Sequence, residues 1–199
     1  EFVNILSNIN LEEESIYGDK IYFVIKKLYE IGEIEKAFDL VSKINLESAN
    51  INKESLEFFY LIKLNYLFSS FKLSEACNLR LILLDESINL PKNLLQKSDI
   101  FCLTLENKLS EAKLLNSLLK ESETVKDENF QKLFNFMMLS ENSNSFTSLV
   151  NIQSKDFVFL YSAMLRINEL PLDEDFIELD PLNLSIPVIL SESTSMNIR

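Results

Sequence analysis

Apolar residues recur along most of this chain at the three- and four-residue spacing that marks one face of an amphipathic helix. In the segment 21–32, four of them share such a face: Ile21, Val24, Ile25 and Leu28. Gly32 then stands where a helix commonly ends in a left-handed residue. A second apolar face follows almost at once in the segment 33–44. Because the gap is so short, the two helices are expected to run antiparallel as a helical hairpin.

This two-helix pattern recurs along the chain. The second helix of the first three copies carries an alanine at the same place, and these alanines lie 39 and 36 residues apart: Ala37, Ala76 and Ala112. Leu149 takes that place in a weaker fourth copy after another 37 residues. Repeats of this length predict stacked helical hairpins, because one hairpin cannot bury its own apolar face. The small residue is expected to let the paired helices approach closely.

The pattern therefore predicts an all-α protein, a right-handed α/α superhelix (solenoid) of about four stacked antiparallel helical hairpins with a short Pro-containing C-terminal segment. The repeat array is expected to fill residues 1–168, with hairpins near 16–44, 55–87, 93–122 and 127–152 and a further helix at 155–167. Residues 169–199 are expected to form an acidic segment that holds three of the four prolines and a short helix at 173–179. Since the chain starts at Glu1 without a methionine and stops without an ending signal, it is expected to be part of a longer protein.

The hairpin corners share a three-position pattern that resembles the tetratricopeptide-like repeat. That family places a glycine at the turn, an aromatic or apolar residue two positions on and a small residue five positions on. The three copies here are Gly32, Ile34 and Ala37; Phe71, Leu73 and Ala76; and Asn107, Leu109 and Ala112. The family's first-helix Trp and Leu-Gly and its closing Pro are missing in every copy, and the spacing exceeds the family's 34 residues. The resemblance covers residues 20–122 well and 127–152 weakly, and it implies a stacked array that binds a peptide or protein.

Two segments, 101–122 and 170–181, are also similar to alphaproteobacterial helical-repeat proteins of unknown function. That similarity implies no activity. One corner departs from the expected chemistry, because Asn107 tolerates a left-handed turn whereas Phe71 does so poorly. Either Ser69 and Ser70 make the turn there, or that corner is built differently.

The charge balance bears on the kind of partner. With 31 acidic and 19 basic residues the chain has a formal net charge of −12, which argues against nucleic acid and against an anionic membrane surface. The acidity fits solubility, or attraction of a basic partner. No apolar run reaches the roughly 18–20 residues of a membrane span, so no membrane insertion is expected. A soluble protein is expected, and both the cytoplasm and the periplasm remain open.

The two cysteines, Cys77 and Cys102, are too few for a disulfide scaffold. The favoured interpretation is two buried, unpaired residues that act as small hydrophobes. A disulfide between them or a reactive thiol are the alternatives.

Catalytic chemistry finds little support in the residue types present. Without histidine, a Ser–His–Asp or Cys–His arrangement cannot be built, and two glycines cannot supply a phosphate-binding loop. The acidic stretches 12–15 and 169–180 are interpreted as helix-start charge rather than a cation site. We therefore predict that the chain is not an enzyme, and we nominate no catalytic, cofactor-binding or metal-ligating residue and no cofactor.

Aromatic residues crowd two of the expected helices, within 58–71 and 130–136, on more than one face. They either fill a solenoid interior or line a groove that binds a partner's segment. The partner-binding candidates are Phe59, Tyr60, Tyr66 and Phe134. The leading hypothesis is a non-catalytic protein–protein interaction or scaffold module for an unknown protein or peptide, more basic than average.

Two other functions stay open. The chain could be an accessory superhelical domain of a larger enzyme, such as a cell-wall lytic transglycosylase, or hold a small-molecule pocket between helices. The oligomeric state is left open as well, since uncapped solenoids can dimerise through a terminal hairpin.

Overall fold

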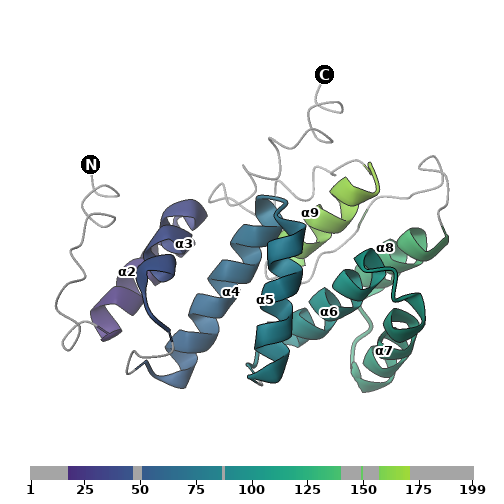
Figure 1. Ribbon diagram of the computed structural model, residues 1–199, viewed down its shortest axis with the longest axis horizontal. Helices are drawn as coiled ribbons and strands as arrows, with labels where there is room; N and C mark the ends of the chain where they lie inside the picture. The colour runs from purple at the N-terminus through teal and green to yellow at the C-terminus, as the bar shows by residue number, and fades with distance from the viewer. Residues whose placement is uncertain (1–17, 47–50, 87, 140–148, 150–156, 171–199) are drawn as a thin grey trace.

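The computed structural model describes residues 18–46, 51–86, 88–139, 149 and 157–170 (Figure 1). Every regular element within these ranges is helical, so the predicted all-α class is confirmed. The elements are α2 (Gly18–Glu30), α3 (Ile34–Lys43), α4 (Lys53–Ser69), α5 (Leu73–Asp85), the 3-10 turn η1 (Pro91–Asn93), α6 (Leu94–Leu105), α7 (Leu109–Ser122), α8 (Glu128–Leu139) and α9 (Val158–Ile167).

The six helices from α2 to α7 pack as three pairs of consecutive helices. Helix α2 packs on α3, α4 on α5, and α6 on α7, while α3 contacts α4 and α5 contacts α6 between successive pairs (Figure 1). Of the fourth hairpin, only α8 and the buried Leu149 are described. Its second helix, the acidic stretch 12–15 and the short helix expected at 173–179 lie outside the described residues. None of the helices that the structure describes has the length and apolarity of a membrane span.

Four helices end in the same way. Each is followed by a residue with positive φ, and these residues are Gly32, Phe71, Asn107 and Glu169. The next residue donates its backbone N–H to the carbonyl oxygen five positions earlier, over 2.8–2.9 Å, which is the 6→1 bond of a Schellman motif. The first position of the three-position corner pattern, at Gly32, Phe71 and Asn107, is therefore the left-handed residue of a repeated helix-ending geometry. The fourth occurrence, after α9, has no counterpart among the predicted corners.

The corner at Phe71 corrects the expectation from sequence. Phe71 itself adopts the left-handed conformation, with φ of 59°, so neither Ser69 nor Ser70 replaces it. Its ring lies under the guanidinium of Arg166, 4.2 Å from the ring centroid, and Arg166 also donates to the Ser69 carbonyl oxygen at 3.0 Å. These contacts and the helix-ending hydrogen bonds offset the cost of positive φ at a bulky residue.

Asn107 offers a direct test of this corner geometry. Asn107→Ala is expected to lower the free energy of unfolding by about 1 kcal/mol, because a Cβ without the asparagine amide disfavours positive φ. Asn107→Gly should keep the stability, since glycine takes this conformation without steric cost. Urea unfolding followed by circular dichroism measures both, with Asn78→Ala on the exposed face of α5 as the control. Equal stability of the alanine and glycine variants at position 107 would contradict the assigned geometry.

The repeated alanines occupy the positions expected of them. Ala37, Ala76 and Ala112 are all fully buried, which is consistent with close approach of the paired helices. The apolar residue three positions before each alanine is less uniform. Ile34 is buried, whereas Leu109 is 36% exposed. The small residue is thus the more constant feature of the repeat.

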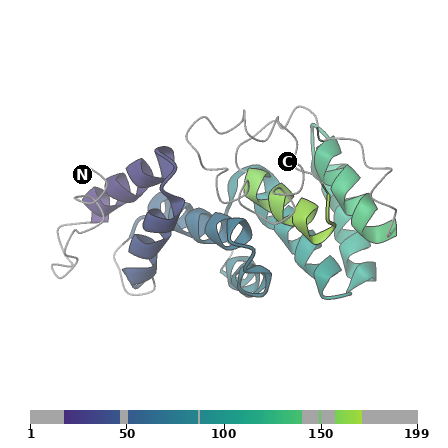
Figure 2. The same ribbon diagram turned by 90° about the horizontal axis from the view of Figure 1, so that it is seen from above.

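Helix α9 does not pack only against the helix that precedes it in the chain. It contacts α4, nearly a hundred residues earlier in the chain, as well as α8 (Figures 1 and 2). All eight residues from Val158 to Leu165 are buried, as expected of a helix enclosed on every side. Helix α9 lies within the segment 155–167 where a helix was expected, and its packing against the second helix pair was not predicted.

The preferred interpretation of the cysteines was wrong. Cys77 and Cys102 are buried as expected, but they form a disulfide with a Cα–Cα distance of 5.5 Å. The bond joins α5 to α6, the two helices at the junction between the second and third hairpins. Packing of those helices brings the two sulfur atoms together, which residue spacing alone does not determine.

Candidate functional site

The four aromatic candidates do not form one surface. Phe59, Tyr60 and Phe134 are buried, and Phe59 belongs to a different apolar cluster from the other two. Tyr60 donates its hydroxyl to Glu86 Oε2 at 3.2 Å. Tyr66 is partly exposed and its ring stacks on Phe38 with centroids 4.0 Å apart. The contact of all four with a partner stays a prediction, and the burial of Phe59, Tyr60 and Phe134 fits the alternative interpretation as interior side chains.

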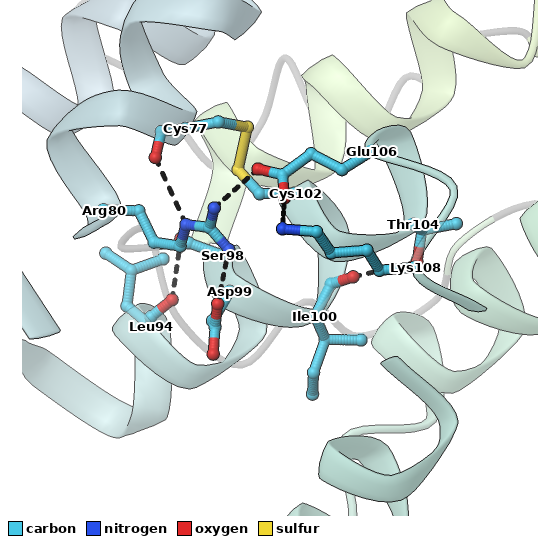
Figure 3. Close-up of a disulfide and its surroundings, with 10 residues drawn as sticks. All are labelled: Cys77, Arg80, Leu94, Ser98, Asp99, Ile100, Cys102, Thr104, Glu106 and Lys108. Atoms are coloured by element: carbon cyan, nitrogen blue, oxygen red, sulfur yellow. Dashed lines mark hydrogen bonds and ion pairs between the residues drawn. A yellow bond between two sulfur atoms is a disulfide. The ribbon is translucent and has the colours of Figure 1, made fainter. Parts of the chain in front are cut away.

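A buried arginine lies beside the disulfide (Figure 3). Arg80 is 1% exposed, and its guanidinium donates to Asp99 Oδ1 and Glu106 Oε1 at 2.6 Å each and to the Cys77 carbonyl oxygen at 3.2 Å. Glu106 also accepts from Lys108 Nζ, and this bond, followed by the charge of Arg80, holds the pKa of the Glu106 carboxyl below its usual value. The arrangement joins α5 to α6 electrostatically where the disulfide joins them covalently.

A second buried cation joins four segments of the fold. Lys97 of α6 is 2% exposed, and its ammonium lies 2.9 Å from Glu123 Oε1 and 2.8 Å from Asp127 Oδ2. The same ammonium is 4.2 Å from the ring centroid of Phe157 and 5.8 Å from that of Phe130. Glu123 follows α7, Asp127 precedes α8, Phe130 belongs to α8, and Phe157 is the residue directly before α9. We interpret the role of Lys97 as structural, because its positive charge is neutralised by the adjacent carboxylates of Glu123 and Asp127.

Tyr161 of α9 completes this cluster by donating its hydroxyl to Asp127 Oδ2. Burial, and then the Asp127 carboxylate, raises the pKa of the Tyr161 phenol. Asp127 also accepts from the Phe130 backbone N–H at 3.1 Å, so the same carboxylate caps α8. Removal of Tyr161 or Asp127 therefore affects several helices at once.

The raised pKa of Tyr161 predicts a pH dependence of stability. In the unfolded chain a tyrosine ionises at about pH 10, whereas the folded protein keeps the Tyr161 proton to higher pH. The stabilisation is thus present below about pH 10 and is lost as the pH rises further, by about 1.4 kcal/mol per pH unit for one proton. Tyr161→Phe should show a shallower loss of stability above about pH 10 than the natural sequence. Identical slopes in urea unfolding at alkaline pH would contradict this assignment.

A pocket of about 400 Å³ opens between α2, the first turns of α4 and the η1 turn, and we call it the acidic–aromatic pocket. Its lining residues are Tyr22, Glu54, Glu57, Phe58, Leu61, Asn89, Leu90, Pro91 and Asn93. Among the lining residues that the structure describes, two carry carboxylates, two carry aromatic rings, and none is a lysine or arginine. Such a composition favours a cationic, partly apolar ligand.

Sequence reasoning missed the two buried cations and this pocket. Arg80 lies on the buried face of α5 with Ala76 and Cys77. A charged residue within an apolar stripe was therefore the sequence signal that could have indicated a buried cation. For the pocket no local signal exists, because its walls come from three separate segments. Over the part of the chain that the structure describes, no group of three or more His, Cys, Asp and Glu side chains could hold a metal ion.

No family model matches this sequence, and comparisons with curated proteins and with solved structures find no match.

Proposed function

We propose that this chain is a non-catalytic protein–protein interaction or scaffold module, built as a tetratricopeptide-like α/α superhelix. The observation that carries the proposal is the recurrence of one hairpin corner, with its positive-φ residue and its buried alanine, in three successive hairpins. Stacked hairpins of this kind present extended surfaces to other proteins. The assignment to the repeat class rests on that geometry and on the sequence pattern.

Exposed apolar side chains indicate where a partner would bind. Helix α7 exposes Leu114 (61%) and Leu118 (52%) one turn apart, and α5 exposes Leu81 (54%) and Leu84 (40%) on a similar stripe. Apolar side chains held in water on one helix face are typical of interaction sites. Because α9 covers part of α4, we place the contact surface on the second helices of the hairpins rather than on the first.

The test is affinity capture of the full-length protein from its source cells at moderate salt, with mass spectrometry of the proteins that co-purify. The variant Leu114→Glu/Leu118→Glu should lose a partner that the natural sequence captures. Gln96→Glu/Asn135→Glu makes the same charge change at exposed positions of α6 and α8 and should retain that partner. Equal capture by both variants would contradict the placement of the surface on α7.

An accessory superhelical domain of a larger enzyme, such as a cell-wall lytic transglycosylase, is the second candidate. One observation favours it, because a buried disulfide is typical of proteins outside the reducing cytoplasm. The full-length coding sequence discriminates the two functions. A downstream catalytic domain together with no specific captured partner would favour the accessory domain over the scaffold.

A further inference from the structure

We infer that the acidic–aromatic pocket binds an arginine side chain of a basic partner segment, with Phe23 contacting an apolar residue beside that arginine. This inference rests on the proposed function and specifies the chemistry of its partner. It depends on the carboxylates of the pocket, on its aromatic rings and on the exposed Phe23 ring that contacts Tyr22.

The carboxylates supply the charge complementarity. Glu54 and Glu57 both line the pocket, one turn apart at the start of α4. Glu57 Oε1 accepts weakly from the Asn89 backbone N–H at 3.4 Å, and Glu54 is exposed. A guanidinium can bond to two carboxylate oxygens at once, which an ammonium cannot do with the same geometry. The acidic surplus of the whole chain adds long-range attraction for a basic segment.

The rings supply a surface on which a planar cation can stack. Tyr22 and Phe58 meet edge to face, with centroids 5.5 Å apart and planes at 71°, so they form two sides of a corner. Tyr22 already attracts a cation, since Lys26 Nζ lies 5.6 Å from its ring centroid. Buried Leu61 and Leu90 add apolar contact for the methylene groups of the arginine.

Phe23 does not line the pocket, but its ring contacts that of Tyr22 and supplies an anchor for the neighbouring residue of the partner. Phe23 is 64% exposed, and its ring centroid is 5.7 Å from that of Tyr22. A large aromatic side chain held in water next to a charged pocket is the pattern of an interface anchor.

Among the described side chains, two lysines, Lys53 and Lys26, compete for this site. Lys53 Nζ is 3.8 Å from Glu57 Oε1, but the lysine side chain is 77% exposed, so this pair is weak. Lys26 lies over Tyr22. An incoming arginine would displace Lys53 from Glu57, so removal of Lys53 should strengthen binding. A purely structural role of these acids would not produce that effect.

The experiment uses the full chain labelled with ¹⁵N and the peptide acetyl-Ser-Gly-Arg-Leu-Gly-Ser-amide as the probe, followed by two-dimensional NMR. Amide shifts are expected around Tyr22, Phe58 and Asn89, with a weaker response when lysine replaces the peptide arginine and none when glutamine does. Glu54→Gln should weaken binding about twofold to fivefold, and Lys53→Gln should strengthen it. Glu75→Gln, which removes the corresponding first-turn acid of α5, should leave binding unchanged.

Equal shifts with the glutamine peptide, or unchanged binding in Glu54→Gln, would overturn the inference. The proposed function would survive that result if the capture experiment still yields a partner that depends on Leu114 and Leu118. If the peptide binds as expected but no partner is captured, arginine binding by the pocket is supported and the assignment of the contact surface to α7 is wrong.

Discussion

Replacement of Lys97 by methionine is expected to lower the free energy of unfolding by about 3 to 5 kcal/mol. The ammonium is 2% exposed and lies within 2.9 Å of both Glu123 and Asp127, whose side chains are themselves only 6% and 16% exposed. Methionine fills a similar volume but leaves two neighbouring carboxylates in a poorly solvated site without a counter-ion. Urea unfolding at neutral pH, followed by circular dichroism, measures the loss.

Two control variants separate this charge effect from a packing effect. Lys120→Met, which removes an exposed lysine from the last turn of α7, should change the stability by no more than about 0.5 kcal/mol. Adding Glu123→Gln to Lys97→Met should recover a large part of the loss, because one of the two uncompensated charges is then gone. A double variant no more stable than Lys97→Met would show that packing, not charge, sets the cost.

Loss of the Cys77–Cys102 disulfide is expected to lower the free energy of unfolding by about 3 to 4 kcal/mol in Cys77→Ala/Cys102→Ala. The two residues are separated by 25 positions, and the estimate follows from the loop entropy that the bond removes from the unfolded chain. Since Cys102 is fully buried and Cys77 nearly so, small cavities add to the cost. Unfolding in urea with and without a thiol reductant measures the effect.

The reductant supplies the matched control for this prediction. It should destabilise the natural sequence and leave the double alanine variant unchanged. Alkylation of the unfolded, unreduced natural protein should modify neither cysteine. Modification of both would mean that the thiols are free and that the disulfide is absent.

Three interactions connect α6 to its neighbouring helices, and together they specify how the hairpins pack. The disulfide and Arg80 join α6 to α5, and Lys97 joins it to the carboxylates that flank α7 and α8. Buried ion pairs add little net stability relative to apolar packing, but one partner left alone is costly. A hairpin packed in another register would leave the charges of Arg80 and Lys97 unpaired. We expect these interactions to act chiefly by destabilising such alternative arrangements.

The helices and their corners could be predicted from the sequence because their causes are local. Spacing of three and four residues places Ile25 and Leu28 on one buried face of α2, and both are fully buried. Gly32 and Asn107 end their helices where a left-handed residue was expected. The corner at Phe71 shows the limit of this reasoning, because the cation that packs on its ring, Arg166, belongs to a distant helix.

The disulfide, the buried ion pairs, the position of α9 and the acidic–aromatic pocket depend on tertiary structure alone. Their partners are far apart along the chain: 19 residues for Arg80 and Asp99, 30 for Lys97 and Asp127, and 97 for Arg166 and Ser69. Periodicity states which face of a helix is apolar, but not which other helix covers it. The local sequence therefore determined the helices and how they end, while packing of complementary faces decided which of them meet and where the pocket opens.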